Sequence, residues 1–254
     1  MNEAASAGSA DEELDRTGIT GRRWNGAGLS GRAFGPLPPE VEAALPRWFA
    51  GDLSGGVALK PPDVHRVGEL VVKRFAAPTV FGLVRAPRAV RSARRHFWCL
   101  PTPSPRPLIA LWRGPGSPSV LVREFVAGRL LADVPAGETE AERALAPFLR
   151  QLVSGRVLHG DLHPRNLLWT GERWLLLDVD GVRHGLHSRR RLLVDMWARL
   201  LLHLGDGSRV HALYRACMEP LGETARAPWT EVERAAARMR ANRSHALPRP
   251  EPSG

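Results

Sequence analysis

Lysine is almost absent from this chain. Only Lys60 and Lys73 occur among its 254 residues, so 34 of the 36 basic residues are arginine. Isoleucine and asparagine are nearly as rare, and a GC-rich genome accounts for all three shortages because the codons of these residues are AT-rich. A GC-rich genome encodes arginine and aspartate more easily than lysine and asparagine. A lysine or asparagine inside an ordered segment is therefore a residue that was not replaced by the easier arginine or aspartate. Lys73 and Asn166 are such residues.

Cysteine and long apolar runs are also scarce. Cys99 and Cys217 are isolated thiols without a disulfide framework, which is typical of a protein in the reducing cytoplasm. The acidic N-terminus lacks the basic and apolar regions of a signal peptide. No apolar run approaches the roughly 18 residues of a membrane span, and the longest, residues 192–204, is interrupted by Asp195 and Arg199. The expected location is therefore the cytoplasm.

Acidic residues are outnumbered by basic ones. The formal net charge is +10 and the isoelectric point is about 11.2. An excess of this size points to an anionic partner: nucleic acid, a membrane surface or a phosphorylated substrate. No nucleic-acid-binding motif occurs, and no strand interleaves basic and aromatic residues, so nucleic acid is the least favoured of the three. The 43% hydrophobic content is that of a globular protein with a sizeable core.

The chain is expected to contain four segments. Residues 1–45 are rich in Gly, Ser, Ala and Arg, and we predict a disordered or weakly ordered arm there. Residues 244–254 are predicted to be a tail. The body between them has a β-rich half over residues 46–126 and a mainly helical half over residues 127–243. Strands followed by helices in this order predict an α+β fold.

Periodicity and turn residues mark the elements of the body. Strands are predicted over residues 57–60, 64–67, 70–75, 108–112 and 120–125. Helices are predicted over residues 86–98, 138–154, 190–204, 208–220 and 229–242, with a small hairpin over residues 167–177.

One loop carries the strongest chemical signal. It reads His159-Gly160-Asp161-Leu162-His163-Pro164-Arg165-Asn166 between two apolar runs, and Asp178 ends a strand twelve residues further on. Transfer of a phosphoryl group from ATP needs this set of groups. One carboxylate orients the acceptor hydroxyl and accepts its proton, while an amide oxygen and a second carboxylate hold Mg²⁺ on the phosphates.

These motifs resemble those of the protein-kinase-like superfamily. The wording of the loop is most similar to that of the lipopolysaccharide kinase family, the Kdo and core-heptose kinases. Residues 71–75, 93–95, 102–108 and 120–125 support the resemblance, which covers roughly residues 55–205. It implies a bilobal fold, with a small antiparallel N-lobe over residues 46–126 and a mainly helical C-lobe over residues 127–243.

The resemblance also implies a role for each motif residue. Lys73 would grip the α- and β-phosphates of ATP, and the backbone and side chains of Glu124–Val126 would lie beside adenine. Asp161 would be the catalytic base, with Asn166 and Asp178 as ligands of Mg²⁺. Two further residues, His159 and Asp195, would support the site structurally, the latter as a buried carboxylate that ties the catalytic loop to the C-lobe.

Length and charge constrain the acceptor. Only 17 residues separate Asp178 from Asp195, which leaves no room for both an activation segment and a peptide-docking platform. This favours a small-molecule or glycan acceptor over a protein. The segment 183–191 is basic and could grip phosphorylated sugars or an anionic inner leaflet, or could simply be a solvated helix start.

Two features depart from the kinase pattern. A kinase lysine normally pairs with a glutamate on the following helix, yet no Asp or Glu occurs between Lys73 and Glu124, and His96 lies near the expected position. The turn Pro61-Pro62-Asp63 also lacks the glycines of a phosphate flap. A pseudokinase therefore remains an alternative to an active enzyme.

Other readings of the motifs fit less well. Gly26–Gly31 spells G-x-G-x-x-G, but no apolar strand precedes it and no helix follows, so we interpret it as part of the flexible arm rather than a dinucleotide site. A metallophosphoesterase would use Asp63 and His65, but none of the asparagines precedes a histidine as that site requires. A zinc site built on His159 and His163 lacks further ligands.

The leading hypothesis is an ATP- and Mg²⁺-dependent kinase that phosphorylates a sugar hydroxyl of a lipopolysaccharide-type glycolipid, with peripheral contact to the anionic inner membrane. The alternatives are a nucleotide-binding pseudokinase scaffold and a small-molecule kinase of the aminoglycoside-phosphotransferase type. The sequence leaves the acceptor hydroxyl and the oligomeric state open.

Overall fold

The structure is a computed structural model that describes residues 21–60, 62–77, 87–98, 104–114, 116–155, 157–183, 189–222 and 226–244. The chain forms two compact units. Unit 1 contains residues 1–97 and 105–126, and unit 2 contains residues 98–104 and 127–254.

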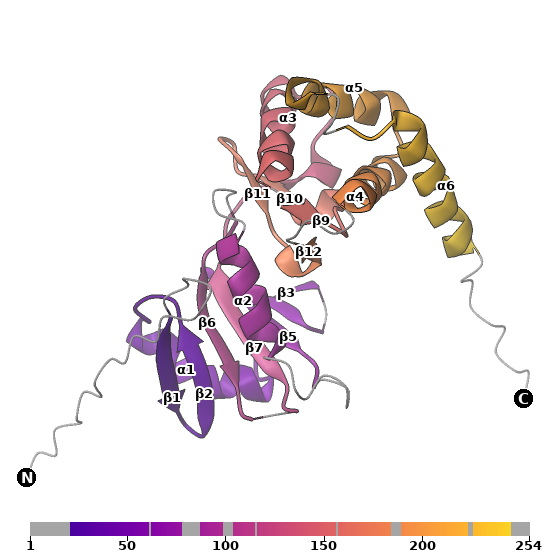
Figure 1. Ribbon diagram of the computed structural model, residues 1–254. Helices are drawn as coiled ribbons and strands as arrows, with labels where there is room; N and C mark the ends of the chain where they lie inside the picture. The colour runs from indigo at the N-terminus through magenta and orange to yellow at the C-terminus, as the bar shows by residue number, and fades with distance from the viewer. Residues whose placement is uncertain are drawn as a thin grey trace, which may run out of the picture. The chain divides into compact units, whose positions relative to one another are not determined.

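Unit 1 is built on a seven-stranded antiparallel sheet with the strand order β1-β2-β6-β7-β5-β4-β3 (Figure 1). Its strands are β1 (Arg22–Gly26), β2 (Leu29–Ala33), β3 (Val57–Lys60), β4 (Val64–Val67), β5 (Leu70–Phe75), β6 (Pro107–Trp112) and β7 (Ser119–Glu124). The five strands expected between residues 57 and 125 are confirmed: β5, β6 and β7 bury apolar residues, whereas β3 is exposed and continues the sheet through its pairing with β4.

Two helices cover opposite faces of this sheet. Helix α1 (Pro39–Ala50) packs Leu45 and Trp48 against Val120 and Val122 of β7. Helix α2 (Arg88–Trp98) packs with Leu121, the strand residue between those two valines. Since successive strand residues point to opposite faces, the two helices lie on different sides of the sheet.

A hairpin occupies the region predicted to be a flexible arm. Strands β1 and β2 pair with each other, and β2 pairs with β6. The turn between β1 and β2 places Ala27 and Gly28 at positive φ, the geometry of a tight two-residue hairpin. Gly31 leaves room for the buried side chain of Leu111, because a Cβ at this position would lie 2.9 Å from Leu111 Cδ2. The G-x-G-x-x-G motif is therefore a hairpin turn and its second strand, not part of an arm.

Helix α1 also lies in the segment expected to be an arm. Its buried residues Val41, Leu45, Trp48 and Phe49 follow helical spacing, and the Nε1–H of Trp24 donates a 2.6 Å hydrogen bond to Glu42 Oε1. The prediction for residues 1–45 is thus wrong from residue 22 onward. The glycines and prolines of this segment predicted irregular structure. Burial against strands that follow much later in the chain instead gives it a hairpin and a helix.

Unit 2 contains four α-helices among its described residues, joined by short strands. The helices are α3 (Thr139–Ser154), α4 (Arg189–Leu204), α5 (Gly207–Met218) and α6 (Trp229–Ser244). The strands are β8 (Arg129–Leu130), β9 (Leu158–His159), β10 (Leu167–Trp169), β11 (Trp174–Leu176) and β12 (Val182–Arg183), and short 3-10 turns span Leu131–Asp133, Pro164–Asn166, Val179–Gly181 and Glu219–Leu221. The predicted helices and the small β10–β11 hairpin are confirmed.

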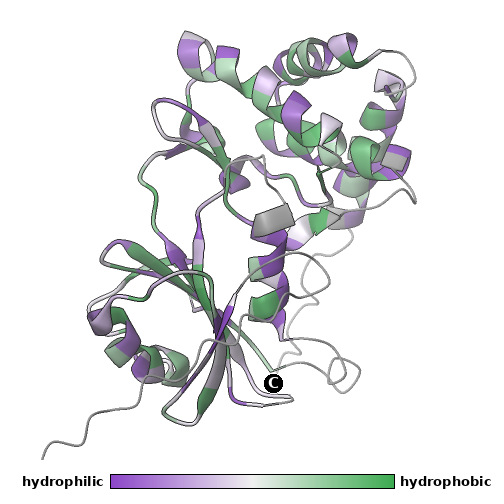
Figure 2. Cartoon of the chain, turned by 60° about the vertical axis from the view of Figure 1, so that its left-hand side comes forward, coloured by the Kyte–Doolittle hydropathy of each residue, from purple (hydrophilic) through white to green (hydrophobic). Residues whose placement is uncertain are grey.

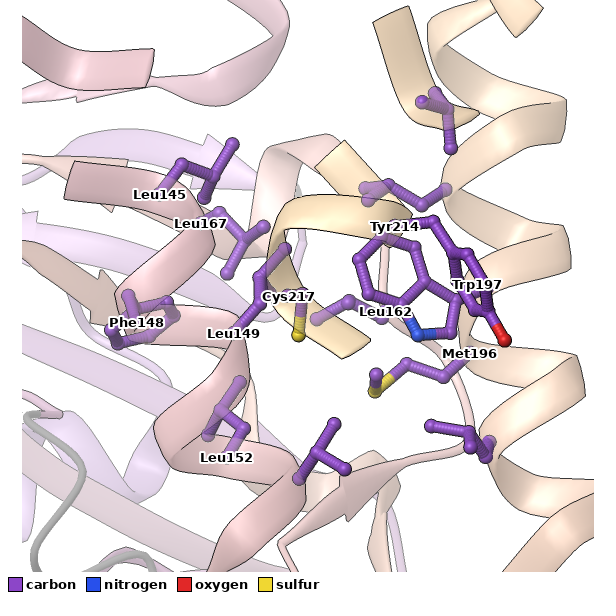
Figure 3. Close-up of a cluster of buried hydrophobic side chains, with 14 of the residues drawn as sticks. Leu145, Phe148, Leu149, Leu152, Leu162, Leu167, Met196, Trp197, Tyr214 and Cys217 are labelled. Atoms are coloured by element: carbon purple, nitrogen blue, oxygen red, sulfur yellow. The ribbon is translucent and has the colours of Figure 1, made fainter. Parts of the chain in front are cut away.

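The core of unit 2 forms where the helices meet. Leu149 of α3, Leu162 of the loop after β9, Trp197 of α4 and Cys217 of α5 are all fully buried and converge there (Figure 3). Hydrophilic and hydrophobic residues alternate along each helix (Figure 2), as expected for helices that bury one side. Through Leu162, this core anchors the loop after β9.

Several expectations fall on residues outside the described part of the chain. These include the arm before residue 21, the tail after residue 244, Cys99, Pro61, and the histidines His184 and His187 of the basic segment. Within the described residues, no helix has the length and apolar character needed to cross a bilayer.

Candidate active site

The loop that carries Asp161 lies between two short strands of unit 2. Strand β9 pairs with β12, and the loop returns to the core through a 3-10 turn at Pro164–Asn166. Leu162 and Pro164 are buried and anchor the loop, whereas the side chain of Asp161 is exposed. The alternation of buried and exposed residues presents the carboxylate to solvent on a fixed backbone.

Asn166 connects this loop to the strand that leads to Asp178. Its Nδ2 donates a 3.1 Å hydrogen bond to the main-chain oxygen of Asp161. The main-chain oxygen of Asn166 accepts a 2.8 Å hydrogen bond from the N–H of Leu177, the residue before Asp178. The structure therefore brings together three residues that lie up to seventeen positions apart in the sequence, namely Asp161, Asn166 and Asp178.

Asp178 lies two residues after β11 and is the N-cap residue of the 3-10 turn Val179–Gly181. Its Oδ1 accepts a 3.1 Å hydrogen bond from the main-chain N–H of Asp180, so the carboxylate caps the turn. Both aspartates are half-buried. This turn places two carboxylates on the chain segment that follows Asn166.

His159 joins the loop to Asp178 directly. Its imidazole is fully buried, and Nδ1 accepts a 3.1 Å hydrogen bond from the main-chain N–H of Asp161. Because Nδ1 accepts, Nε2 carries the proton and donates it to the main-chain oxygen of Asp178. Burial lowers the pKa of His159 below its usual value, which keeps the ring neutral, as this double role requires.

Gly181 packs against the same imidazole. A Cβ at this position would lie 2.6 Å from His159 Cε1, so only glycine fits without displacement. The main-chain N–H of Gly160 also donates a 2.9 Å hydrogen bond to the oxygen of Gly181. The buried histidine thus ties the Asp161 loop to the Val179–Gly181 turn.

The sequence analysis missed the partner of the exposed aspartate. Nη1 of Arg199, on α4, donates a 2.9 Å hydrogen bond to Oδ1 of Asp161. Arg199 interrupts an apolar helix between the buried residues Ala198 and Leu200. A charged residue at such a position is the signal that could have identified it.

Asp195 does not have the position expected for it. It is half-buried rather than buried, and it lines a groove between α4 and α6. An ion pair between α4 and the Asp161 loop comes instead from Arg199, one helical turn later. Asp195 lines the groove because it lies on the side of α4 that faces α6, which packs along α4.

The other predicted residues belong to unit 1. Lys73 lies on β5, half-buried, with its Nζ 5.1 Å from the centre of the Phe75 ring. Phe75 packs with α2, and Lys73 shares its face of the sheet, so the lysine lies on the α2 side. The buried His96 of α2 follows Ala89 and Ala93 at helical spacing and faces the same side.

Glu124 and Val126 lie where the chain leaves unit 1. Glu124 is the last residue of β7, and its N–H donates a 3.0 Å hydrogen bond to the oxygen of Arg106. The N–H of Phe125 donates to the oxygen of Glu69 at 2.8 Å. Both Glu124 and Val126 are half-buried.

The donor chemistry of the Asp161 loop fits magnesium. Asn166 and Asp178 offer an amide and a carboxylate oxygen, the hard ligands that Mg²⁺ prefers, and Mg²⁺ commonly takes only one or two carboxylates because phosphates and water complete its shell. Within the described ranges, no cluster of three or more His, Cys, Asp or Glu side chains is arranged to hold a metal. The oxygen atoms of Asn166 and Asp178 therefore suit a hard divalent cation such as Mg²⁺.

Comparison with known proteins identifies the fold. No protein-family model matches the chain, and no curated protein matches it. A structure of WaaP in complex with acyl carrier protein matches with a TM-score of 0.50 and 16% identity over 82% of this chain and 94% of that one. An aminoglycoside-3'-phosphotransferase of type VIII matches with a TM-score of 0.52 and 20% identity, over 78% and 98% of the two chains.

A third match is the aminoglycoside phosphotransferase APH(3'')-Id from Streptomyces rimosus in complex with ADP and streptomycin. Its TM-score is 0.51 and its identity 14%, over 79% of this chain and 97% of that one. The chain therefore has the protein-kinase-like fold, and the predicted α+β fold class is confirmed.

Proposed function

We propose that this protein is a kinase that transfers the γ-phosphoryl group of ATP, with Mg²⁺, to a sugar hydroxyl of a lipopolysaccharide-type glycolipid. The observation that carries the proposal is the linked arrangement of Asp161, Asn166 and Asp178 around the neutral, buried His159. In a fold shared with phosphotransferases, this arrangement offers a base and two oxygen ligands within one rigid loop system.

Each residue has a defined task in this proposal. The exposed carboxylate of Asp161 accepts a hydrogen bond from the acceptor hydroxyl, orients its oxygen and takes its proton. Asn166 and Asp178 would hold Mg²⁺, which neutralises charge on the phosphates when it is bound. In unit 1, Lys73 would bind the α- and β-phosphates, and Glu124–Val126 would contact the adenine.

Arg199 contributes to the base. Its guanidinium lies 2.9 Å from Oδ1 of Asp161 and so fixes the direction of the carboxylate. The second carboxylate oxygen then remains for the acceptor hydroxyl. Positioning of this kind is a large share of catalysis in phosphoryl transfer, where the protein performs little covalent chemistry.

Three features support a sugar acceptor at the cytoplasmic face of the inner membrane. Asp195 follows Asp178 by only 17 positions, too few for an activation segment with a peptide platform. One matching structure is of an aminoglycoside phosphotransferase in complex with ADP and streptomycin. The basic residues before and within α4 suit an anionic acceptor or surface.

The test is a transfer assay with the purified chain. Mg-ATP is incubated with Kdo-lipid A, with heptosylated core and with an aminoglycoside, and phosphorylated product is measured by mass spectrometry. We expect product with a glycolipid and a rate about 100- to 10,000-fold lower in Asp161→Asn, which removes the base but keeps the shape. Asp180→Asn is the matched control, and we expect it to retain most of the rate. Absence of product with every acceptor would rule the proposal out.

A pseudokinase is the second candidate, and the layer between α2 and β5 favours it. The buried His96 lies on the α2 face that covers Lys73, and no acidic residue occurs between Lys73 and Glu124. An active kinase normally pairs its lysine with a glutamate from this helix. Stabilisation by ATP in a thermal-shift titration, without transfer to any acceptor, would favour this candidate over the first.

A further inference from the structure

A groove with a volume of about 830 Å³ runs between α4 and α6 in unit 2. Four arginines line it, two from each helix: Arg190 and Arg191 on α4, and Arg234 and Arg238 on α6. The pairs lie more than forty positions apart in the sequence, so only the packing of the two helices brings them together. Neither the catalytic loop nor its partner Arg199 lines this groove.

The groove has an excess of positive charge. Two carboxylates, those of Asp195 and Glu231, face the four guanidinium groups. Glu231 is taken by Arg190, whose Nη2 lies 2.6 Å from Oε1 and whose Nε lies 3.2 Å from Oε2. Among the residues that the structure describes, Arg191 and Arg238 make no hydrogen bond or ion pair. Two exposed guanidinium groups from opposite walls are thus available to an anion.

The remaining lining indicates which anion would fit. Val194, Ala235 and Met239 provide an apolar surface, while Asp195 and Asn242 provide a hydrogen-bond acceptor and an amide. Guanidinium groups bind phosphate through paired hydrogen bonds, and an apolar surface with a few polar groups suits the body of a sugar. The volume lies within the range of about 300–1,000 Å³ that is common for small-molecule sites. A sugar phosphate therefore matches the groove better than a protein surface would.

Helix α4 connects this groove to the candidate catalytic residue. Arg191, Asp195 and Arg199 follow one another at intervals of four residues and lie along one side of the helix. Eight residues correspond to a rise of about 12 Å along the axis. Arg191 in the groove and Arg199, which binds Asp161, are therefore separated by about two helical turns.

We infer that the α4–α6 groove binds the phosphate group of a phosphorylated sugar through Arg191 and Arg238. The identification of this ligand as the acceptor rests on the proposed kinase function. If that function holds, the acceptor already carries one phosphate before it reaches Asp161. The sugar phosphate can be a free molecule or the headgroup of a glycolipid, since the groove recognises the same group in both.

Binding is measured by calorimetry without ATP or Mg²⁺, so that the result does not depend on turnover. The soluble probes are glucose 1-phosphate, glucose and inorganic phosphate, and monophosphoryl lipid A in detergent micelles is the glycolipid probe. We expect at least one phosphorylated sugar to bind at least about tenfold more tightly than glucose, because it adds charge-assisted contacts to the arginines. It should also bind at least about tenfold more tightly than phosphate, because its sugar contacts the apolar and polar lining that phosphate cannot reach. Binding of glucose 1-phosphate identifies a free ligand, and binding of the lipid alone identifies a headgroup.

The double variant Arg191→Gln/Arg238→Gln should weaken this binding at least about tenfold. Arg240→Gln, an exposed arginine of α6 outside the groove, is the matched control and should change it less than twofold. Asp161→Asn should bind as the natural chain does. Absence of transfer by the natural chain, with binding intact, would count against the kinase proposal alone. The inference is overturned if neither sugar phosphate binds, if phosphate binds as tightly as either, or if Arg240→Gln weakens binding as much as the double variant. Unchanged thermal unfolding verifies that each variant is folded.

Discussion

Replacing His159 by leucine tests the network that organises the candidate active site. Leucine has a similar volume but no polar atoms, so the N–H of Asp161 and the C=O of Asp178 lose their partner. An unsatisfied buried polar group costs about 1–3 kcal/mol. Both contacts are partly buried, so we take the lower half of this range for each of the two groups. Together, the two unsatisfied groups should lower the free energy of unfolding by about 3 kcal/mol.

The pH dependence of this loss has a defined sign. Burial lowers the pKa of His159 in the folded protein, whereas the unfolded chain keeps a value near 6.5. As the pH falls below 6.5, the unfolded chain takes up a proton that the folded protein resists, so the natural protein loses stability by at most about 1.4 kcal/mol per pH unit from this group. His159→Leu lacks this contribution. The difference in the free energy of unfolding between the natural protein and His159→Leu should therefore be smaller at pH 5 than at pH 7.5.

Urea unfolding of both proteins between pH 7.5 and pH 5 measures these quantities. For a chain of this length, a loss of 3 kcal/mol corresponds to a decrease of about 6–12 °C in the melting temperature. The control is His211→Phe, which alters a half-buried histidine stacked on Trp229 and should show neither the full loss nor the narrowing. A pH-independent difference, or one that widens at low pH, would refute the neutral, doubly bonded state of His159.

Three further predictions address other parts of the chain. Trp24→Ala should lower the free energy of unfolding by about 3–5 kcal/mol in urea titrations, because this side chain is 7% exposed and bonded to Glu42; a change within 0.5 kcal/mol, as roughly expected for a surface residue, would mean that the β1–β2 hairpin is not part of the folded unit. In a Cys99→Ser background, Cys217 should resist iodoacetamide at pH 8 until the protein unfolds, because burial raises the pKa of its thiol to about 12; rapid labelling of the native protein would contradict the packing of unit 2. Arg199→Gln should change stability by less than about 1 kcal/mol, since the Arg199 and Asp161 side chains are 33% and 62% exposed. If the kinase proposal holds, the same variant should lower kcat for transfer roughly 10- to 100-fold through misplacement of the carboxylate, and an unchanged kcat would show that Arg199 does not position the base.

Local patterns predicted the parts of this protein whose contacts are short in sequence. Strands β5, β6 and β7 and the helices of unit 2 have buried faces that the spacing of apolar residues already reveals. The loop from His159 to Asn166 likewise closes on itself through Asn166 Nδ2 and the oxygen of Asp161, five positions apart. Such contacts depend on spacing along the chain, which the sequence states directly.

Contacts between distant segments could not be predicted, because they do not depend on spacing along the chain. Nothing near residues 22–33 indicates that β2 pairs with β6, which begins more than seventy positions later, and the local glycines argued for an arm. The same holds for Arg199, whose partner lies 38 positions away.

The amino-acid sequence by itself determined the α+β order of elements and the carboxylate and amide groups of Asp161, Asn166 and Asp178, on which the proposed phosphoryl transfer depends. The tertiary structure decided which of these residues meet, that His159 is buried and neutral, and that Asp195 lines a basic groove. The physical reason is that residue type and spacing are local properties, whereas burial, ionisation and charge pairing depend on neighbours that only the packed chain supplies.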